Sequence, residues 1–477
     1  MPTIVTVGTA SAKGFGWSSG GPKINYYIIS FDRFSNNNGT QGTLAYSPAT
    51  GEVYTGLNYD TSASPAAAFG FARIKISDFS VTYTQHLNEV ATGILSAPYF
   101  SQPLYNPAAG ITFHMYTGGL NLYGNFSTGG VPSYSWIKRY VLSIASYPTL
   151  DSAAQTIDGS GNHYIGGTYH GTVTLCCCVT ADTYATYIMK TSSFGVQQWQ
   201  FYASFNYYSY YILQGIKAAS SGNVYAIYES DLGPGKFVKF DTNGTVQWAN
   251  TITNSVSAFG GSGGVEKNHN IAIDSSENIY LSVTFGTVYS LIKYNSSGTL
   301  QWARRYIPVS PSTQMGSGFA IGVSSSGDIY LWGSGYPAAT TGSLYLLKYN
   351  SSGTIQWQRK WTTNNSTSGD QLMQNYGGVI VATDGSVLLG AYGIGAGTNV
   401  GFPTVFKLPA DGTGTGSYTL QSAVYTYASV SGTDSNYTSS ITTTASSHGS
   451  TSTTSTATLG TSSFTSTTVS KDTVSVV

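Results

Sequence analysis

The property that most constrains this chain is an internal repeat. Residues 291–304 read LIKYNSSGTLQWAR and residues 346–359 read LLKYNSSGTIQWQR. Five fainter copies align with these two, and they begin at Phe71, Leu122, Tyr187, Phe237 and Val405. A fixed period of this kind is typical of chains built from copies of one structural unit.

A second motif precedes each copy. It is clearest as SGNHY, SGNVY and SGDIY, and its second residue falls at positions 51, 110, 161, 222, 277, 327 and 385. The intervals between these positions run from 50 to 61 residues. We therefore expect seven units of similar length.

Each unit reads as two hairpins. The Ser-Gly-Asn turn lies between a short apolar stretch and an alternating Val/Ile-Tyr stretch, and the Asn-Ser-Ser-Gly turn lies between two further alternating stretches. Gly and Asn suit the left-handed turn positions of hairpins. Four-stranded antiparallel units repeated seven times predict an all-β, seven-bladed β-propeller. Two sets of aromatic residues should then fill the space between blades: Trp199, Trp248, Trp302 and Trp357, with Tyr164, Tyr225, Tyr280 and Tyr330.

The Lys-x4-Gly-x3-Trp period, with SGNxY ahead of it, resembles the β-propeller repeat families of bacteria and their viruses, and more loosely quinoprotein-type blades. The resemblance covers roughly residues 40–425 and is strongest in the fourth to sixth units. The stretch ASAKGFGW near the N-terminus is similar to short Gly-aromatic elements of bacteriophage virion proteins. Together these resemblances imply a propeller in a tail or fibre protein.

The two ends of the chain lie outside the repeat. We expect an N-terminal arm over residues 1–22, a propeller over residues 23–430, and an assembly segment over residues 431–477. Residues 23–36 include an apolar strand candidate that could complete the last blade. In the last segment, 29 of 47 residues are Ser or Thr. If ordered, their backbone groups need partners, so we expect strands added to the propeller or to another chain.

Charged residues are scarce and balanced. The 477 residues include 20 Lys and Arg and 20 Asp and Glu, so 8% are charged, against roughly 25% in an ordinary soluble domain. Nucleic-acid binding needs a concentrated basic face, so we expect no nucleic-acid partner. With 41% hydrophobic and 14% aromatic residues, the chain can bury a sizeable core.

The N-terminus lacks the basic and apolar regions of a secretory signal, and no apolar run approaches a membrane span. We therefore expect synthesis in a host cytoplasm without a signal peptide, and no membrane insertion. Cys176, Cys177 and Cys178 are consecutive, a spacing that suits neither a zinc site nor a disulfide framework. We expect no metal and no other cofactor.

Three sets of residues are candidates for chemistry or recognition. Asp158, Asp274 and Asp384 recur at the first turn, where we favour Asx-turns over cation sites. Lysines recur in the second hairpin, where we favour packing between strands over an anion-binding ring; they are Lys75, Lys190, Lys239, Lys293, Lys348 and Lys407. Four tyrosines in FNYYSYYIL could stack on sugars or bind a protein, or could pack between blades; they are Tyr207, Tyr208, Tyr210 and Tyr211.

These observations favour a structural component of a virus particle, a bacteriophage tail or fibre protein that binds a host-surface glycan or protein. Its partners would be other virion proteins or copies of itself, contacted through the two terminal segments. One alternative is a free-standing carbohydrate- or protein-binding propeller on a bacterial surface, and another is a capsid decoration protein. No known catalytic motif occurs. A glycan-degrading enzyme needs a pair of carboxylates that the sequence does not place, so we expect no enzyme.

Overall fold

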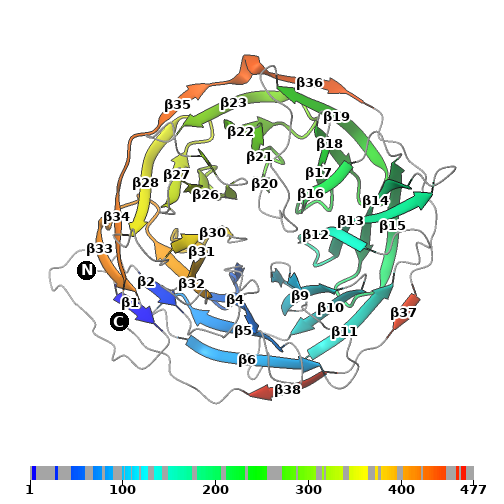
Figure 1. The fold of residues 1–477 in the computed structure, drawn as a ribbon, viewed down its shortest axis with the longest axis horizontal. Helices are drawn as coiled ribbons and strands as arrows, with labels where there is room; N and C mark the ends of the chain where they lie inside the picture. The colour runs from blue at the N-terminus through cyan, green and yellow to red at the C-terminus, as the bar shows by residue number, and fades with distance from the viewer. Residues whose placement is uncertain are drawn as a thin grey trace. The chain divides into compact units, whose positions relative to one another are not determined.

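In a computed structural model, the chain has an all-β fold of small antiparallel sheets of the propeller type (Figure 1). The structure describes residues 3–6, 27–30, 44–59, 68–77, 81–89, 99–100, 103–108, 110–117, 120–126, 134–141, 149–174, 180–205, 211–230, 235–254, 271–285, 288–307, 314–315, 319–336, 343–363, 371–373, 378–394, 401–420, 423–446, 458–460 and 464–468. Among these residues the one helical segment is a 3-10 turn, η1, at Thr438–Ser440.

Contacts divide the chain into two compact units, and each is described by itself. The first unit comprises Met1–Ala97, Tyr306–Asp434 and Phe464–Val477. It contains two blades, a term we use for a sheet whose four antiparallel strand positions follow one another along the chain. The strands of one blade are β3 (Leu44–Ser47), β4 (Glu52–Tyr59), β5 (Ala68–Lys75) and β6 (Val81–Glu89). Those of the other are β24 (Gln314–Met315), β25 (Ala320–Val323), β26 (Ile329–Tyr336), β27 (Ser343–Tyr349) and β28 (Ile355–Thr363). In this second blade, β24 and β25 share the first position, because both pair with β26.

The second unit comprises Pro98–Arg305 and Ser435–Ser463 and contains four blades. Short strands share the first position of one blade, where β7 and β8 both pair with β9. The strands are β7 (Tyr99–Phe100), β8 (Leu104–Asn106), β9 (Gly110–Thr117), β10 (Leu120–Phe126) and β11 (Tyr134–Val141); β12 (Thr149–Ile157), β13 (His163–Thr174), β14 (Thr180–Thr191) and β15 (Gln197–Phe205); β16 (Tyr211–Ala218), β17 (Val224–Ser230), β18 (Gly235–Phe240) and β19 (Val246–Asn254); β20 (Ile271–Ile273), β21 (Ile279–Phe285), β22 (Val288–Tyr294) and β23 (Leu300–Ile307).

The repeat beginning at Val405 does not form the predicted hairpin. Its sheet, in the first unit, contains β29 (Gln371–Met373), β30 (Val379–Val381), β31 (Val387–Ile394) and β32 (Gly401–Leu408). The outer partner of β32 is β2 (Tyr27–Ser30), which pairs in parallel with β1 (Thr3–Thr6). The next strand, β33 (Gly416–Leu420), pairs instead with β34 (Ala423–Ser429).

The described residues therefore contain six blades of consecutive strands, and the prediction of seven such units was wrong. The physical reason lies in the last copy, which lacks the Gln-Trp pair of the strongest repeats. The apolar β2 segment, with Ile28 and Ile29, occupies the edge of β32 in its place. The prediction that residues 23–36 supply a completing strand is confirmed.

The first turn of each repeat has the predicted left-handed residue. All seven predicted positions have positive φ, and six of them are glycine. The seventh is Glu277, with φ of 56°, and it is the one non-glycine residue with positive φ among those the structure describes. Because side chains disfavour this conformation, we expect other contacts of Glu277 to compensate for the backbone strain at this turn.

The Ser/Thr-rich segment forms strands on the outer edges of the sheets. These strands are β35 (Thr433–Asn436), β36 (Ile441–Ala445), β37 (Thr458–Gly460) and β38 (Phe464–Thr468). Three pairings are antiparallel, β36 with β19, β37 with β11 and β38 with β6, and β35 lies beside β23. Figure 1 shows β36 running along β19. Of the two predicted partners for this segment, its described strands use the sheets of the same chain.

Apolar side chains from neighbouring blades form the cores. In the second unit, Tyr225 and Ile227 of β17 pack with Ile279 and Leu281 of β21. Tyr437 and Ile441 from the C-terminal segment belong to the same cluster. In the first unit, a cluster around Trp332 and Trp361 joins β26 and β28 to the sheet of β31 and β32. Alternation along the strands brings these side chains to the faces where sheets meet.

Candidate functional site

The predicted recognition tyrosines divide into two groups. Tyr207, Tyr208 and Tyr210 lie outside the described residues. Tyr211 begins β16, is half-buried and packs against the core of its blade. The ammonium of Lys236 lies 4.6 Å from the centre of its ring. Burial raises the pKa of Tyr211 and lowers that of Lys236. The observed contacts of Tyr211 are thus with its own chain.

The predicted interblade tyrosines and tryptophans meet within each blade. Ring centres are 5.9 Å apart for Tyr164 and Trp199 and 6.1 Å apart for Tyr225 and Trp248. The other two pairs, Tyr280 with Trp302 and Tyr330 with Trp357, are 6.2 and 6.1 Å apart. The recurring lysine lies over each of these tyrosine rings, with Nζ 5.2 to 5.3 Å from the ring centre. Burial raises the pKa of all four tyrosines.

The tryptophan and the lysine of one blade bind the second turn of the next. Trp199 Nε1 donates to the carbonyl of Thr242 at 2.8 Å, and Lys190 Nζ donates to the same oxygen at 3.1 Å. Trp248 and Lys239 repeat this arrangement on the carbonyl of Ser296, at 3.2 Å each. Both lysines thus bond to protein carbonyls.

A carboxylate organises the first turn of two blades. Asp158 Oδ1 accepts hydrogen bonds from the amides of Ser160 and Asn162, and its Oδ2 accepts from Asn162 Nδ2 and the Tyr164 hydroxyl. Asp274 repeats all four contacts with Ser276, Asn278 and Tyr280. The interpretation of Asp158 and Asp274 as Asx-turn residues is confirmed.

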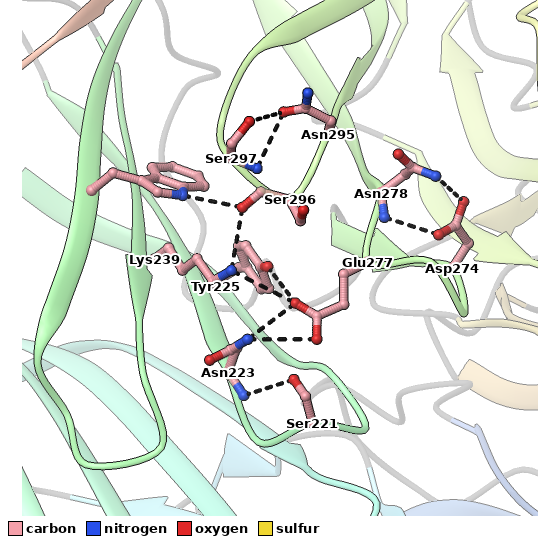
Figure 2. A network of polar contacts seen from close by, with 11 residues as sticks. Ser221, Asn223, Tyr225, Lys239, Asp274, Glu277, Asn278, Asn295, Ser296 and Ser297 are labelled. Carbon is pink, nitrogen blue, oxygen red and sulfur yellow. Dashed lines mark hydrogen bonds and ion pairs between the residues drawn. The ribbon is translucent and has the colours of Figure 1, made fainter.

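Blade β16–β19 departs from this arrangement. Ala219 occupies the position of the turn aspartate, although Asn223 and Tyr225 are kept. Figure 2 shows Glu277, from the turn before β21, reaching these two residues. Its Oε2 accepts from the Tyr225 hydroxyl at 2.9 Å and from Asn223 Nδ2 at 3.1 Å, and lies 3.7 Å from Lys239 Nζ.

The electrostatics of Glu277 follow from this environment. Burial acts to raise the pKa of its carboxyl, but hydrogen bonds from Ser221, Asn223 and Tyr225 and the charge of Lys239 outweigh burial and lower it. Glu277 was not among the residues selected from the sequence. The signal was present, because SENIY has glutamate where the other strong copies have glycine.

In the first unit, two lysines that match Lys190 and Lys239 in the repeat form ion pairs. Lys348 Nζ lies 2.9 Å from Asp328 Oδ2, and Lys407 Nζ lies 3.0 Å from Asp384 Oδ2. Lys407 also donates to the carbonyl of Ile76 at 2.6 Å. Burial acts to raise the pKa of Asp384, but hydrogen bonds from Ser386 and Lys407 and the Lys407 charge lower it overall.

The described part of the chain contains no cluster of three metal-ligating side chains. Cys176, Cys177 and Cys178 lie outside the described residues. In the described part of the chain, no helix is long and apolar enough to cross a membrane.

No protein-family model and no curated protein matches the chain. Among solved structures, it is similar to the polysaccharide lyase Uly1, with 10% identity over 80% of this chain and 92% of that one, and a TM-score of 0.44. It is also similar to the NanB sialidase from Streptococcus pneumoniae, with 9% identity over 79% of this chain and 70% of that one, and a TM-score of 0.38. For a mutant of that sialidase, the TM-score is 0.37.

These similarities correct one expectation. The sequence led us to exclude an enzyme, and that exclusion was wrong, because the similar solved structures are those of a lyase and a sialidase. With TM-scores below 0.5, the likeness assigns neither reaction to this chain.

Proposed function

We propose that the chain is a structural component of a virus particle, a bacteriophage tail or fibre protein whose propeller binds a host-surface glycan or protein. In this proposal it is made in the host cytoplasm and acts in the virion. Its partners there are other virion proteins or further copies of the chain.

One observation carries the binding part of the proposal. Five charged groups of the described blades are engaged inside the protein, where Asp158, Asp274 and Glu277 organise turns and Lys190 and Lys239 join neighbouring blades. The second-hairpin turns expose mainly Ser, Thr, Asn and Gln side chains, with Asp241 in one turn and the apolar Phe194 and Val196 in another. Uncharged polar groups beside aromatic rings suit hydrogen bonding and stacking with sugars, and they also suit protein contacts.

Two other functions remain alternatives. A free-standing binding propeller on a bacterial surface would be found on cells in the absence of virus particles. A capsid decoration protein would be found on particles that lack tails. Mass spectrometry of purified tails, capsids and cell envelopes separates these locations.

The binding part is tested with purified full-length protein on intact bacteria and on polysaccharides extracted from their surfaces. We expect saturable retention that free polysaccharide or a host-surface protein fraction competes away. Product release is measured in the same tubes, so a glycan that is cleaved as well as bound is detected. Equal retention on host and unrelated cells would refute the proposal.

A further inference from the structure

We propose that Glu277 is a latch between two blades, supplying from the turn before β21 the carboxylate that blade β16–β19 lacks at Ala219. The inference does not depend on the proposed function. It assigns a defined conformational role to the one described residue that breaks the glycine rule of the first turns.

Comparison of neighbouring repeats carries the argument. Asp158 and Asp274 each accept the hydroxyl of the tyrosine and the amide of the asparagine in their own blade, at 3.0 and 2.8 Å. Blade β16–β19 keeps both donors, Tyr225 and Asn223, but has Ala219 in place of the acceptor. Without another acceptor, two polar groups in a mostly buried setting would lose their bonds.

Glu277 accepts from the same two donors across the junction. Its contacts with the Tyr225 hydroxyl and Asn223 Nδ2, at 2.9 and 3.1 Å, are close to those made by the two aspartates. A glutamate placed one blade away therefore replaces an aspartate within the blade, which converts a contact inside one turn into a bond between two blades.

The backbone conformation of Glu277 is a second observation that supports a specific role for its side chain. Its φ of 56° is tolerated by glycine, which occupies the six equivalent turns. Glutamate there is strained, and such strain persists where surrounding contacts outweigh it. The contacts of the carboxylate are the evident compensation.

The latch should be sensitive to acid. The groups facing Glu277 from blade β16–β19 are Tyr225 and Lys239, with the neutral Asn223 and Ser221. On its own turn, Asp274 bonds to Ser276, Asn278 and Tyr280. Because the pKa of Glu277 is lowered in the folded protein, its stabilising contribution is full above the unfolded pKa. That contribution is lost as pH falls through the folded pKa.

The test is hydrogen exchange of the full chain, read by mass spectrometry over residues 219–228 and 274–280. We expect Glu277→Gln to raise exchange over residues 219–228 by about tenfold at neutral pH, the change that follows from losing a hydrogen bond to a charged group. Glu277→Gly should do the same despite relieving the backbone. Ala219→Asp together with Glu277→Gly should restore protection, because the carboxylate returns to its own turn.

Two results would overturn the latch. One is wild-type protection in Glu277→Gln, and the other is a double variant as open as Glu277→Gly. If Glu277→Gly does not fold, the wild-type protein still decides. Its exchange over residues 219–228 should rise, relative to the carboxylate-free turn at residues 350–354, as pH falls below about 4.3, the ordinary pKa of a glutamate. Equal responses would refute the proposal.

Discussion

Replacing Ile441 with alanine tests whether the C-terminal segment is held by its own chain. Ile441 begins β36, pairs with Asn254 of β19 and is 5% exposed in the core of the second unit. Truncation of a buried isoleucine to alanine costs 2–5 kcal/mol. Because an outer strand can shift to fill part of the space, we expect the lower end, about 2 kcal/mol. That corresponds to roughly a 30-fold rise in local opening.

Hydrogen exchange of β36 at neutral pH measures this opening without assuming that the chain unfolds in one step. Thr442→Ala is the matched control, because Thr442 is the next residue of the same strand and its side chain is exposed. It should change local stability by less than about 0.5 kcal/mol. Light scattering of both variants records any change in oligomeric state.

Equal exchange of β36 in Ile441→Ala and Thr442→Ala would refute the reasoning, because it would mean that Ile441 is not packed as described. Dissociation of an oligomer in the Ile441→Ala sample would instead indicate that the strand joins two chains.

Three further predictions follow from single contacts. Gly244→Ala should destabilise the second unit by about 2 kcal/mol or more in urea unfolding, because the residue has φ of 83° and an added Cβ would lie 2.8 Å from the Trp199 ring. The control Gly385→Ala should cost about half as much, because Gly385 has a similar φ of 81° but an added Cβ there would have no atom within 4 Å. Trp199→Phe removes the donor to Thr242 and should cost about 1 kcal/mol in urea unfolding, with Lys190 still bonded to that carbonyl. Asp384→Asn should reduce the acid sensitivity of the first unit, because the lowered pKa of Asp384 means that its stabilising contribution is present above the unfolded pKa and is lost as pH falls through the folded pKa. Urea midpoints measured over a pH series check this, and midpoints that stay parallel to those of the wild type would contradict it.

The local structure of the repeats could be predicted from the sequence because turn chemistry is local. Gly161 and Gly222 were placed at left-handed turn positions from their motif alone, and both have positive φ. The Asx-turn at Asp158 was predicted in the same way, since its acceptors and donors lie within four residues.

Contacts between distant segments could not be predicted in that way. The sequence contained the unusual Glu277, but only the position of the neighbouring turn shows that its carboxylate meets Tyr225, 52 residues away. The count of seven hairpin units failed for the same reason, because the edge of β32 is occupied by β2 from the other end of the chain.

The sequence by itself determined the class of fold, through alternation of apolar residues and through turn residues whose backbone preferences act within a few positions. Only the tertiary structure decided which strand covers each edge and which carboxylate satisfies each buried donor. Backbone edges accept any extended segment that reaches them, so the choice among segments such as β2, β33 and β36 depends on the packing of the whole chain.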